Sequence, residues 1–443
     1  MAAIDRSIYE ELTIESADRR KTVDLRSGVV SIDYYEDIFS PVITAKVRVV
    51  NTGNSIQPSD RQGNPDGLKQ AIYNGLPLRG GERVSMKIKG NSKYNPGLDF
   101  ATNPENNLYV SSITDVFAES LRETFVLHLT SREAITNETV RVARKYPTSA
   151  TIDVAVKDIL ATYLKCKSVG VIEKSKNTYG FISNSRKPFT ILIWLASKAV
   201  PTTVSGSAGF VFYQTKSGFQ FRSIDGLITQ PSKSTYDYTQ VNRSKLQANT
   251  DFFILKYSID KNQNLIEKLK LGAFASERRY FNPIDFTFTN PEEGKFSLKS
   301  LSKSKIKNLG KSLDSGLNVP EQLKDAPSRI FSGILDFGTL ERDVSKAQNA
   351  NPLEYQSQSL LRYNLLMTQT LNITIPSNTN LCAGDIITCK FPKISNGGRP
   401  EPDDQQSGLY MIKELCHHFD TEGSYTSLKI VRDTFGLYGT NNK

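Results

Sequence analysis

The sequence is poor in the residue types from which active sites and metal centres are usually built. It has three histidines, four cysteines and one tryptophan among 443 residues. It has no Gly-rich loop followed by Lys-Ser/Thr, no G-x-S-x-G and no H-E-x-x-H motif. Because His417 and His418 are adjacent in an expected strand, they point to opposite faces and cannot readily bind one metal ion. We therefore expect no catalytic residues, no metal, no cofactor and no enzymatic activity.

The cysteines are too few and too scattered for a disulfide framework, which fits a reducing cytoplasm. They are Cys166, Cys382, Cys389 and Cys416, and no pair has the C-x-x-C spacing of a zinc site. Cys389 shares an expected strand face with Ile387 and Phe391, as a small buried apolar residue would.

Long apolar runs are also missing. The longest, Ile191–Ala196, is far shorter than the roughly 20 residues of a membrane-spanning helix. The N-terminus is acidic within five residues and has no apolar stretch typical of a signal peptide. We expect a protein without membrane segments that stays where it is made unless it leaves within a larger assembly.

The chain has 56 basic and 46 acidic residues, a net charge of +10. The excess is spread along expected strands, as at Arg83, Lys87 and Lys89, which is typical of solvated sheet faces. A nucleic-acid-binding function stays open, motivated by this charge and by the lysines from Lys299 to Lys311. Stacking aromatics are not interleaved with those lysines.

The length suggests about three domains, and the pattern predicts a mainly β (α+β) fold. Residues 1–147 read as all-β, residues 148–250 as a small α/β unit, and residues 251–443 as β again. Strands are expected at Val23–Tyr35, Val42–Asn51, Arg83–Lys89, Leu108–Val116, Thr124–Thr130, Phe252–Ile259, Leu265–Phe274, Ile284–Thr289, Leu371–Ile375, Ile386–Phe391, Leu409–Phe419 and Thr426–Arg432.

Helices are expected at Thr151–Leu164, Thr190–Val200 and Leu353–Thr370, and a hairpin at Phe210–Tyr213 and Phe219–Arg222. Long Gly/Asn/Pro-rich excursions at 51–74 and 90–107 are expected to be functional or flexible. Residues 299–351 form a Lys/Ser/Gly-rich tract that is poor in aromatics and is expected to be an exposed insertion.

The segment Val29–Thr52 is the most informative part of the chain. Its second half alternates apolar and polar residues as a half-buried strand does. Between its halves lies the corner segment, Tyr34–Pro41, which combines two tyrosines, two carboxylates and a phenylalanine before a proline. On composition alone, an ordinary hairpin corner with partly exposed aromatics is an equally good interpretation.

The corner segment resembles the N-terminal signature of baseplate hub proteins of contractile-tailed, T-even-like bacteriophages, which are related to the base of type VI secretion spikes. Further segments match in order and cover both ends and the middle of the chain. They are Leu76–Val84, Tyr109–Asp115, Phe125–Ser131, Ile191–Ala199 with Trp194, Leu381–Asp385, Ser407–Ile412 and Leu428–Gly436. The tract 299–351 has no match.

The resemblance implies two tail-tube-like β-barrel domains per chain, at 1–147 and 251–443, flanking the α/β domain. It implies a homotrimeric ring that joins the hexameric tail tube to the trimeric central spike. Other baseplate proteins would be partners, and phage DNA would pass through the lumen without specific binding. The protein would lie in the virion tail baseplate after assembly in the host cytoplasm. Tyr34, Tyr35, Glu36, Asp37 and Phe39 are expected at a subunit or tube contact.

An alternative is the spike base of a non-viral contractile injection system. Such spikes usually carry a long β-helical needle, and no needle repeat precedes Lys443. We therefore expect the spike to be a separate protein.

Overall fold

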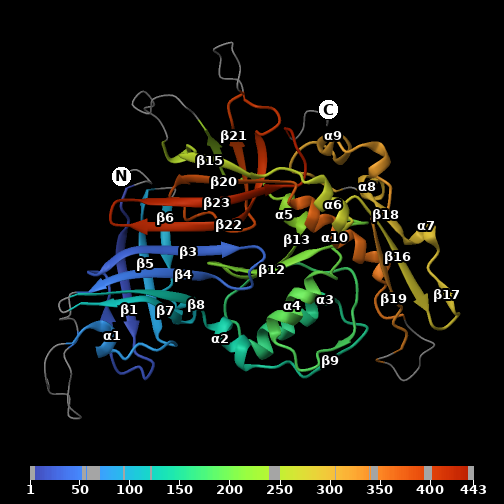
Figure 1. Cartoon of the computed structure of the whole chain (residues 1–443). Helices are drawn as coiled ribbons and strands as arrows, with labels where there is room; N and C mark the ends of the chain where they lie inside the picture. Colours follow the sequence, from blue (N-terminus) through green and yellow to red (C-terminus); the bar gives the residue numbers. More distant parts are fainter. Residues whose placement is uncertain are drawn as a thin grey trace.

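The computed structural model describes residues 5–51, 56, 70–92, 95–119, 122–238, 250–304, 306–338, 340, 348–393 and 402–437. The chain is mainly β, as the alternating pattern predicted. Most strands belong to one sheet of 14 strands, and α-helices gather beside it (Figure 1).

The first part of the sheet comes from the N-terminal third of the chain. Its strands are β1 (Ile8–Glu15), β2 (Thr22–Asp24), β3 (Val29–Asp37), β4 (Thr44–Asn51), β5 (Arg83–Ser92), β6 (Asn95–Asp99), β7 (Leu108–Ala118) and β8 (Glu123–Ser131), with the short helix α1 (Ile72–Gly75). The single strand expected at Val23–Tyr35 is two strands, β2 and β3, because a turn in which the Gly28 N–H donates to the Leu25 carbonyl separates them.

The middle region contains the two helices and the hairpin that the sequence predicted. Its elements are α2 (Arg132–Thr139), β9 (Lys145–Tyr146), α3 (Ile152–Asp158) with a π-helical turn (Ile159–Tyr163), β10 (Val169–Ile172), β11 (Phe181–Ile182), α4 (Pro188–Ala196), β12 (Phe210–Thr215), β13 (Gly218–Ser223) and α5 (Ile224–Ile228). The helices and the hairpin bury a common apolar core that includes Ile152, Leu192 and Phe221.

The C-terminal region returns to the large sheet after an excursion into a smaller one. Its elements are β14 (Thr235–Asp237), β15 (Lys256–Lys261), α6 (Leu265–Leu271), β16 (Ala275–Asn282), β17 (Thr287–Phe288), α7 (Pro291–Gly294), β18 (Lys295–Ser297), α8 (Leu298–Ser302), α9 (Leu313–Leu317), β19 (Arg329–Ile334), α10 (Gln356–Leu366), β20 (Gln369–Pro376), β21 (Ile386–Lys390), β22 (Gly408–Asp420) and β23 (Ser424–Arg432).

The strand expected at Leu265–Phe274 is wrong, because most of this segment is helix α6. The Asn264 side chain accepts a hydrogen bond from the Glu267 N–H, and Gly272 ends the helix in the left-handed conformation. Asparagine at the N-cap and glycine after the last turn are typical helix boundaries. These local capping signals outweigh the near-alternation of apolar residues.

The tract 299–351 was expected to be exposed, but much of its described part packs against the rest of the chain. Leu301, Leu309, Leu313 and Leu317 are buried, and β19 pairs in parallel with β16. The backbone N–H of Leu309 donates to the Asp433 carboxylate over 2.8 Å. Residues 305, 339 and 341–347 of this tract lie outside the described residues, as do 52–55, 57–69, 93 and 94 of the two predicted excursions.

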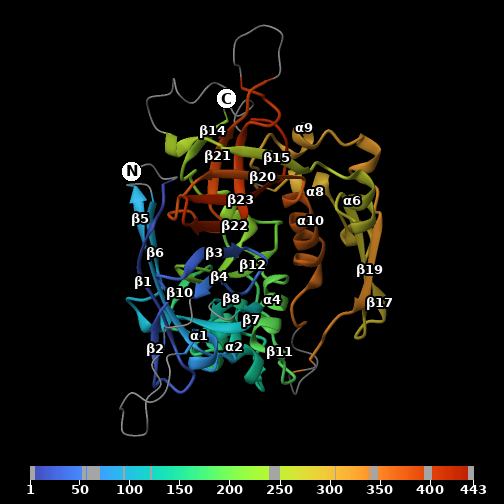
Figure 2. The same ribbon diagram turned by 60° about the vertical axis from the view of Figure 1, so that its left-hand side comes forward.

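Strands from the two ends of the chain form one continuous sheet. Its order is β15-β20-β23-β22-β3-β4-β8-β7-β5-β1-β2, so β3 and β22 pair where the two parts meet (Figures 1 and 2). We call this strand pair the seam. One apolar core spans it and contains Val47, Leu129, Ile373 and Ile430. The division into two β-domains and a middle domain stays a prediction.

Candidate assembly surface at the seam

The seam places the predicted corner segment against the last long hairpin of the chain. Strand β22 runs antiparallel to β3, and Glu414 to Asp420 pair in register with Asp37 to Ser31. Residues Tyr34 to Asp37 therefore lie in a strand, and the chain turns only after Asp37, whose carbonyl accepts the Ser40 N–H. Alternation along β3 sends neighbouring side chains to opposite faces.

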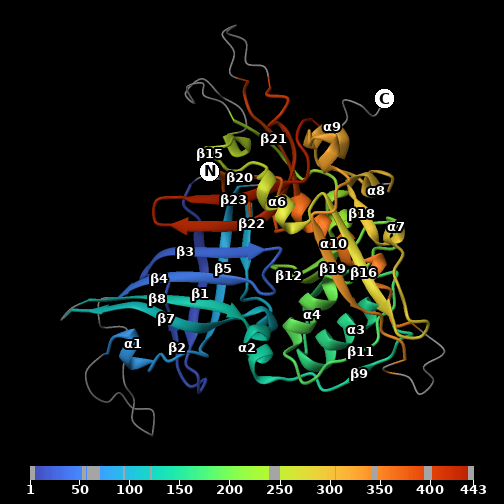
Figure 3. The ribbon, with the colours of Figure 1, turned by 45° about the vertical axis from the view of Figure 1, so that its right-hand side comes forward.

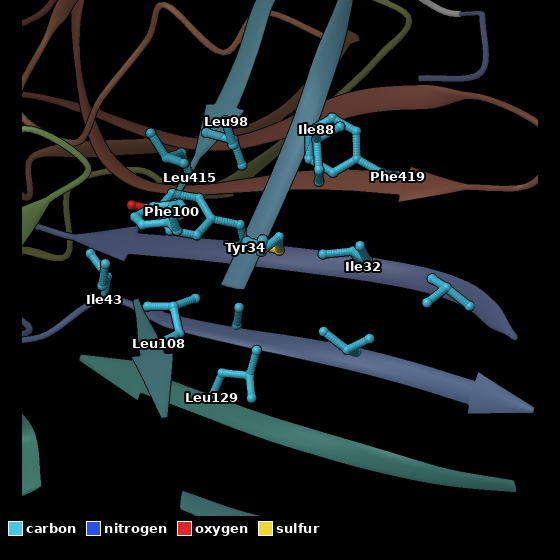
Figure 4. Packing of buried hydrophobic residues seen from close by; sticks show 14 of the residues in the cluster. Ile32, Tyr34, Ile43, Ile88, Leu98, Phe100, Leu108, Leu129, Leu415 and Phe419 are labelled. Carbon is cyan, nitrogen blue, oxygen red and sulfur yellow. The ribbon is translucent and has the colours of Figure 1, made fainter. Parts of the chain in front are cut away.

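Tyr34 points into the core. Its ring lies 5.3 Å from that of Phe100, measured between centroids (Figure 4). It also stacks on the His417 ring, with the centroids 6.1 Å apart. Its hydroxyl donates to Glu36 Oε1 over 2.8 Å. Tyr34 is completely buried, so it is part of the packing within the chain.

Glu36 is buried beside Tyr34 and joins three parts of the fold. Besides the Tyr34 hydroxyl, it accepts the N–H of Lys216 over 2.7 Å, in the turn between β12 and β13. It also accepts the N–H of Ala383 over 2.8 Å, in the segment before β21. Burial raises the pKa of Glu36 to about 7, and this effect outweighs the three donated hydrogen bonds, each of which lowers the pKa. This carboxylate fixes the seam to the middle region.

Tyr35, Asp37 and Phe39 lie on the outer side. Tyr35 is half-buried and carries Lys46 Nζ over its ring at 5.7 Å. Phe39 is 41% exposed and meets the Tyr363 ring edge-on at 6.4 Å. Lys413 Nζ lies 3.3 Å from Asp37 Oδ2. These three residues, unlike Tyr34 and Glu36, can reach another molecule.

Two shallow hollows cross this outer side. The first, of about 300 Å³, is lined by Tyr35, Glu36, Asp37, Ser40, Val42, Thr44, Lys46, Glu414 and Leu415. The second, of about 400 Å³, shares Tyr35, Glu414 and Leu415 and extends over β23, β20 and β15. The lining includes the lysines Lys46, Lys256 and Lys429 and the carboxylates Glu36, Asp37 and Glu414.

His418 occupies the outer face beside the hollows. Its Nδ1 is hydrogen-bonded to the Asp33 carboxylate, and its Nε2 lies 3.1 Å from Asp420 Oδ2. The hydrogen bond with Asp33 is the largest cause that raises the pKa of His418, and the hydrogen bond with Asp420 raises it further. His417, one residue earlier, faces the core, where burial lowers its pKa to about 3.

Among the described residues, no cluster of three His, Cys, Asp or Glu side chains is placed to hold a metal ion. Burial raises the pKa of Cys166, Cys382 and Cys416 to about 12 and raises that of Cys389 as well. Such thiols are poor nucleophiles at neutral pH. No helix in the described part is long and apolar enough to cross a membrane.

The structure thus separates the five predicted contact residues into two inside the chain and three on its surface. Sequence reasoning missed Lys413 and Glu414, which lie beside Asp37, and His418, which is hydrogen-bonded to Asp33 on the same strand. These come from a strand about 380 positions away in the chain, and no local pattern marks such a pairing.

Comparisons with known proteins agree with the resemblance. No family model matches the chain. The probable baseplate hub protein gp334 of Vibrio phage KVP40 is 22% identical over 323 residues, covering 70% of this chain and 73% of that protein. Two solved structures share the fold, each with a TM-score of 0.52. They are a tail protein from Neisseria meningitidis MC58 (11% identity, 95% of this chain and 96% of that one) and the 43 kDa tail protein of prophage MuSo2 from Shewanella oneidensis (9%, 96% and 100%). The chain therefore shares the fold of these tail proteins and is similar in sequence to a phage baseplate hub protein, and these likenesses support a structural role in a phage tail.

Proposed function

We propose that this chain is a baseplate hub protein that forms a trimeric ring between the hexameric tail tube and the trimeric central spike. Its function is mechanical, without an enzymatic step. Tail tube, spike and other baseplate proteins bind it, and DNA passes through its lumen without specific binding. The proposal places the protein in the virion, after assembly in the bacterial cytoplasm.

The observation that carries this proposal is the continuous sheet across the seam. A hub transmits force between tube and spike, so two β-regions in one subunit need a fixed relative position. Here β3 and β22 pair over seven residues of each strand, and Glu36 accepts hydrogen bonds from Lys216 in the middle region and from Ala383 before β21. The likeness to a phage hub protein over 70% of the chain gives independent support.

The experiment is to measure the mass of the purified chain by sedimentation and to image it by electron microscopy, alone and mixed with the spike protein of the same phage. We expect particles of three copies with an open centre. A chain that stays monomeric with and without the spike would contradict the proposal.

A further inference from the structure

A small sheet projects from the molecule and exposes apolar side chains at its outer end. We call β16, β17, β19 and the 283–286 connection the arm; Figure 1 labels its three strands, and Figure 3 shows β16 and β19 from another side. Its exposed apolar residues, with their exposed fractions, are Ile284 (51%), Phe286 (78%), Phe288 (70%), Ile330 (54%) and Ile334 (70%). Apolar side chains concentrated in this way mark an interaction surface.

The strand register explains why one face of the arm is bare. Phe281 pairs with Phe288 on one side and with Ile334 on the other, so these three share the outer face. The inner face carries Ser276 and Arg278, which are buried against α10. The inner face therefore packs and hydrogen-bonds within the chain, and the outer face is available to a partner.

Acidic residues lie on and beside the arm: Asp285 is in the 283–286 connection, and Glu292 and Glu293 are in α7, where the Glu293 carbonyl accepts a hydrogen bond from Arg278 in β16. Asp285, Glu292 and Glu293 are exposed. None of the three forms a salt bridge within the described part of the chain. Glu277 and Arg279, nearer the body, neutralise each other at 2.7 Å. Together with α7, the arm therefore presents apolar side chains and three exposed carboxylates outside salt bridges, against one such exposed arginine among the described residues, Arg329 in β19.

A second surface has the opposite charge. Strand β10 is an edge strand that pairs only with β13 in its three-stranded sheet. Its Val169 and Val171 are 45% and 52% exposed. Four exposed lysines flank it, none of them in a salt bridge with a described residue: Lys165, Lys167, Lys174 and Lys176. The nearby Glu173 carboxylate is occupied, accepting from the Ser223 N–H and hydroxyl.

We propose that the arm of one copy docks on the β10 edge of the next copy. The two surfaces match in apolar character and are opposite in charge. In the view of Figure 2 the two surfaces lie toward opposite sides of the molecule, so the arm of one copy does not contact the β10 edge of the same copy. A contact between two different surfaces repeats from copy to copy and closes into a ring when the rotation allows it. This inference rests on the proposed ring and names the residues that hold it together.

A charge exchange in the full-length chain tests the contact. One variant combines Glu292→Lys with Glu293→Lys, a second combines Lys167→Glu with Lys174→Glu, and a third carries all four changes. We expect each pair alone to weaken self-association about tenfold or more, since it places like charges together. The fourfold variant should recover most of the loss, because its charges are opposite again.

Lys89→Glu with Lys303→Glu is the matched control, since both lysines are exposed elsewhere. Sedimentation velocity measures association, and circular dichroism confirms that each variant is folded. Phe286→Ala with Phe288→Ala should also weaken association without unfolding the chain. Recovery in the fourfold variant supports the contact.

Three results would overturn this inference. If the trimer forms equally in all variants, the contact lies elsewhere and the ring proposal stands. If only the arm changes weaken assembly, the arm binds another copy's arm or a different protein. If the unmodified chain is monomeric at every concentration and with its spike, the inference and the ring proposal fail together.

Discussion

At the scale of single residues, Glu36 is the side chain on which the seam most depends. Glu36→Gln keeps the shape of the side chain but replaces one acceptor oxygen with an NH2 group. That group is itself a donor, so it faces an N–H or O–H donor that has lost its acceptor. A buried donor left without an acceptor costs about 1–3 kcal/mol. We expect the free energy of unfolding in urea to fall by about that amount. Glu292→Gln, at an exposed position, should change it by less than about 0.5 kcal/mol, and equal effects would contradict this role.

The two adjacent histidines should respond to pH in opposite senses. The pKa of His418 in the folded chain lies above its usual 6.5. The stability it contributes is therefore complete below about pH 6.5 and is lost as the pH rises through the folded-state pKa. The pKa of His417 is lowered to about 3, so its contribution is complete above about pH 6.5 and is lost as the pH falls toward 3.

Proton NMR of the imidazole signals between pH 5 and 8 measures this difference. We expect the His418 signal to titrate and the His417 signal to stay neutral throughout. His418→Gln should remove the titrating signal and the gain in stability at low pH. Titration of His417 near pH 6.5 would mean that it does not face the core in solution.

At the scale of helices and strands, a buried ion cluster holds α10 in place. Arg362 is fully buried and lies 2.6 Å from Asp225 Oδ1 in α5 and 3.0 Å from Asp433 Oδ2 after β23. Arg362→Ala leaves two buried carboxylates uncompensated, so we expect the free energy of unfolding to fall by about 3–5 kcal/mol. Arg279→Ala removes a salt bridge whose arginine is exposed and should cost about 1 kcal/mol or less. If thermal unfolding showed a similar loss of stability for Arg362→Ala and Arg279→Ala, the buried ion cluster would not hold α10 in place.

The tract 299–351 provides a second test at this scale. Since Leu309 is fully buried between α10 and the chain end, Leu309→Ala should lower the free energy of unfolding by about 2–5 kcal/mol. Deleting residues 303–315 should destabilise the C-terminal strands. Ser315→Ala is an exposed control. If the variant lacking residues 303–315 were as stable as the unmodified chain, the tract 299–351 would be an exposed insertion, as the sequence predicted.

The elements that the sequence predicted are those with strong local patterns. Alternation located β5 and β8, helical spacing located α3, and the position after Pro352 located α10. Prediction failed where capping decided the conformation, as in α6, and where a polar tract buried scattered leucines. The seam could not be predicted, because a strand register between distant segments leaves no signature in either one. For the same reason, the sequence identified the corner segment without revealing which of its side chains face inward.

At the scale of the whole molecule, the outer side of the seam should be needed for assembly and not for folding. Tyr35→Ala with Phe39→Ala removes two large half-exposed rings, so we expect loss of binding to the tail tube or to a neighbouring copy. Sedimentation with the tube protein measures this, and circular dichroism should stay unchanged. Phe117→Ala, at a 54% exposed position, is the control. Normal assembly of the double variant would show that these rings are only local packing.

The seam also has a consequence for how the protein is made. Asp37 and its partner Lys413 are 376 positions apart, and a ribosome adding about 5–20 residues per second needs roughly 20–75 s to span that interval. During this time the outward edge of β3 has no neighbour, and unpaired strand edges are prone to aggregation. Contacts between distant segments also form slowly. Soluble production should therefore improve with slower synthesis at low temperature, and a chain truncated before β22 should accumulate as aggregate.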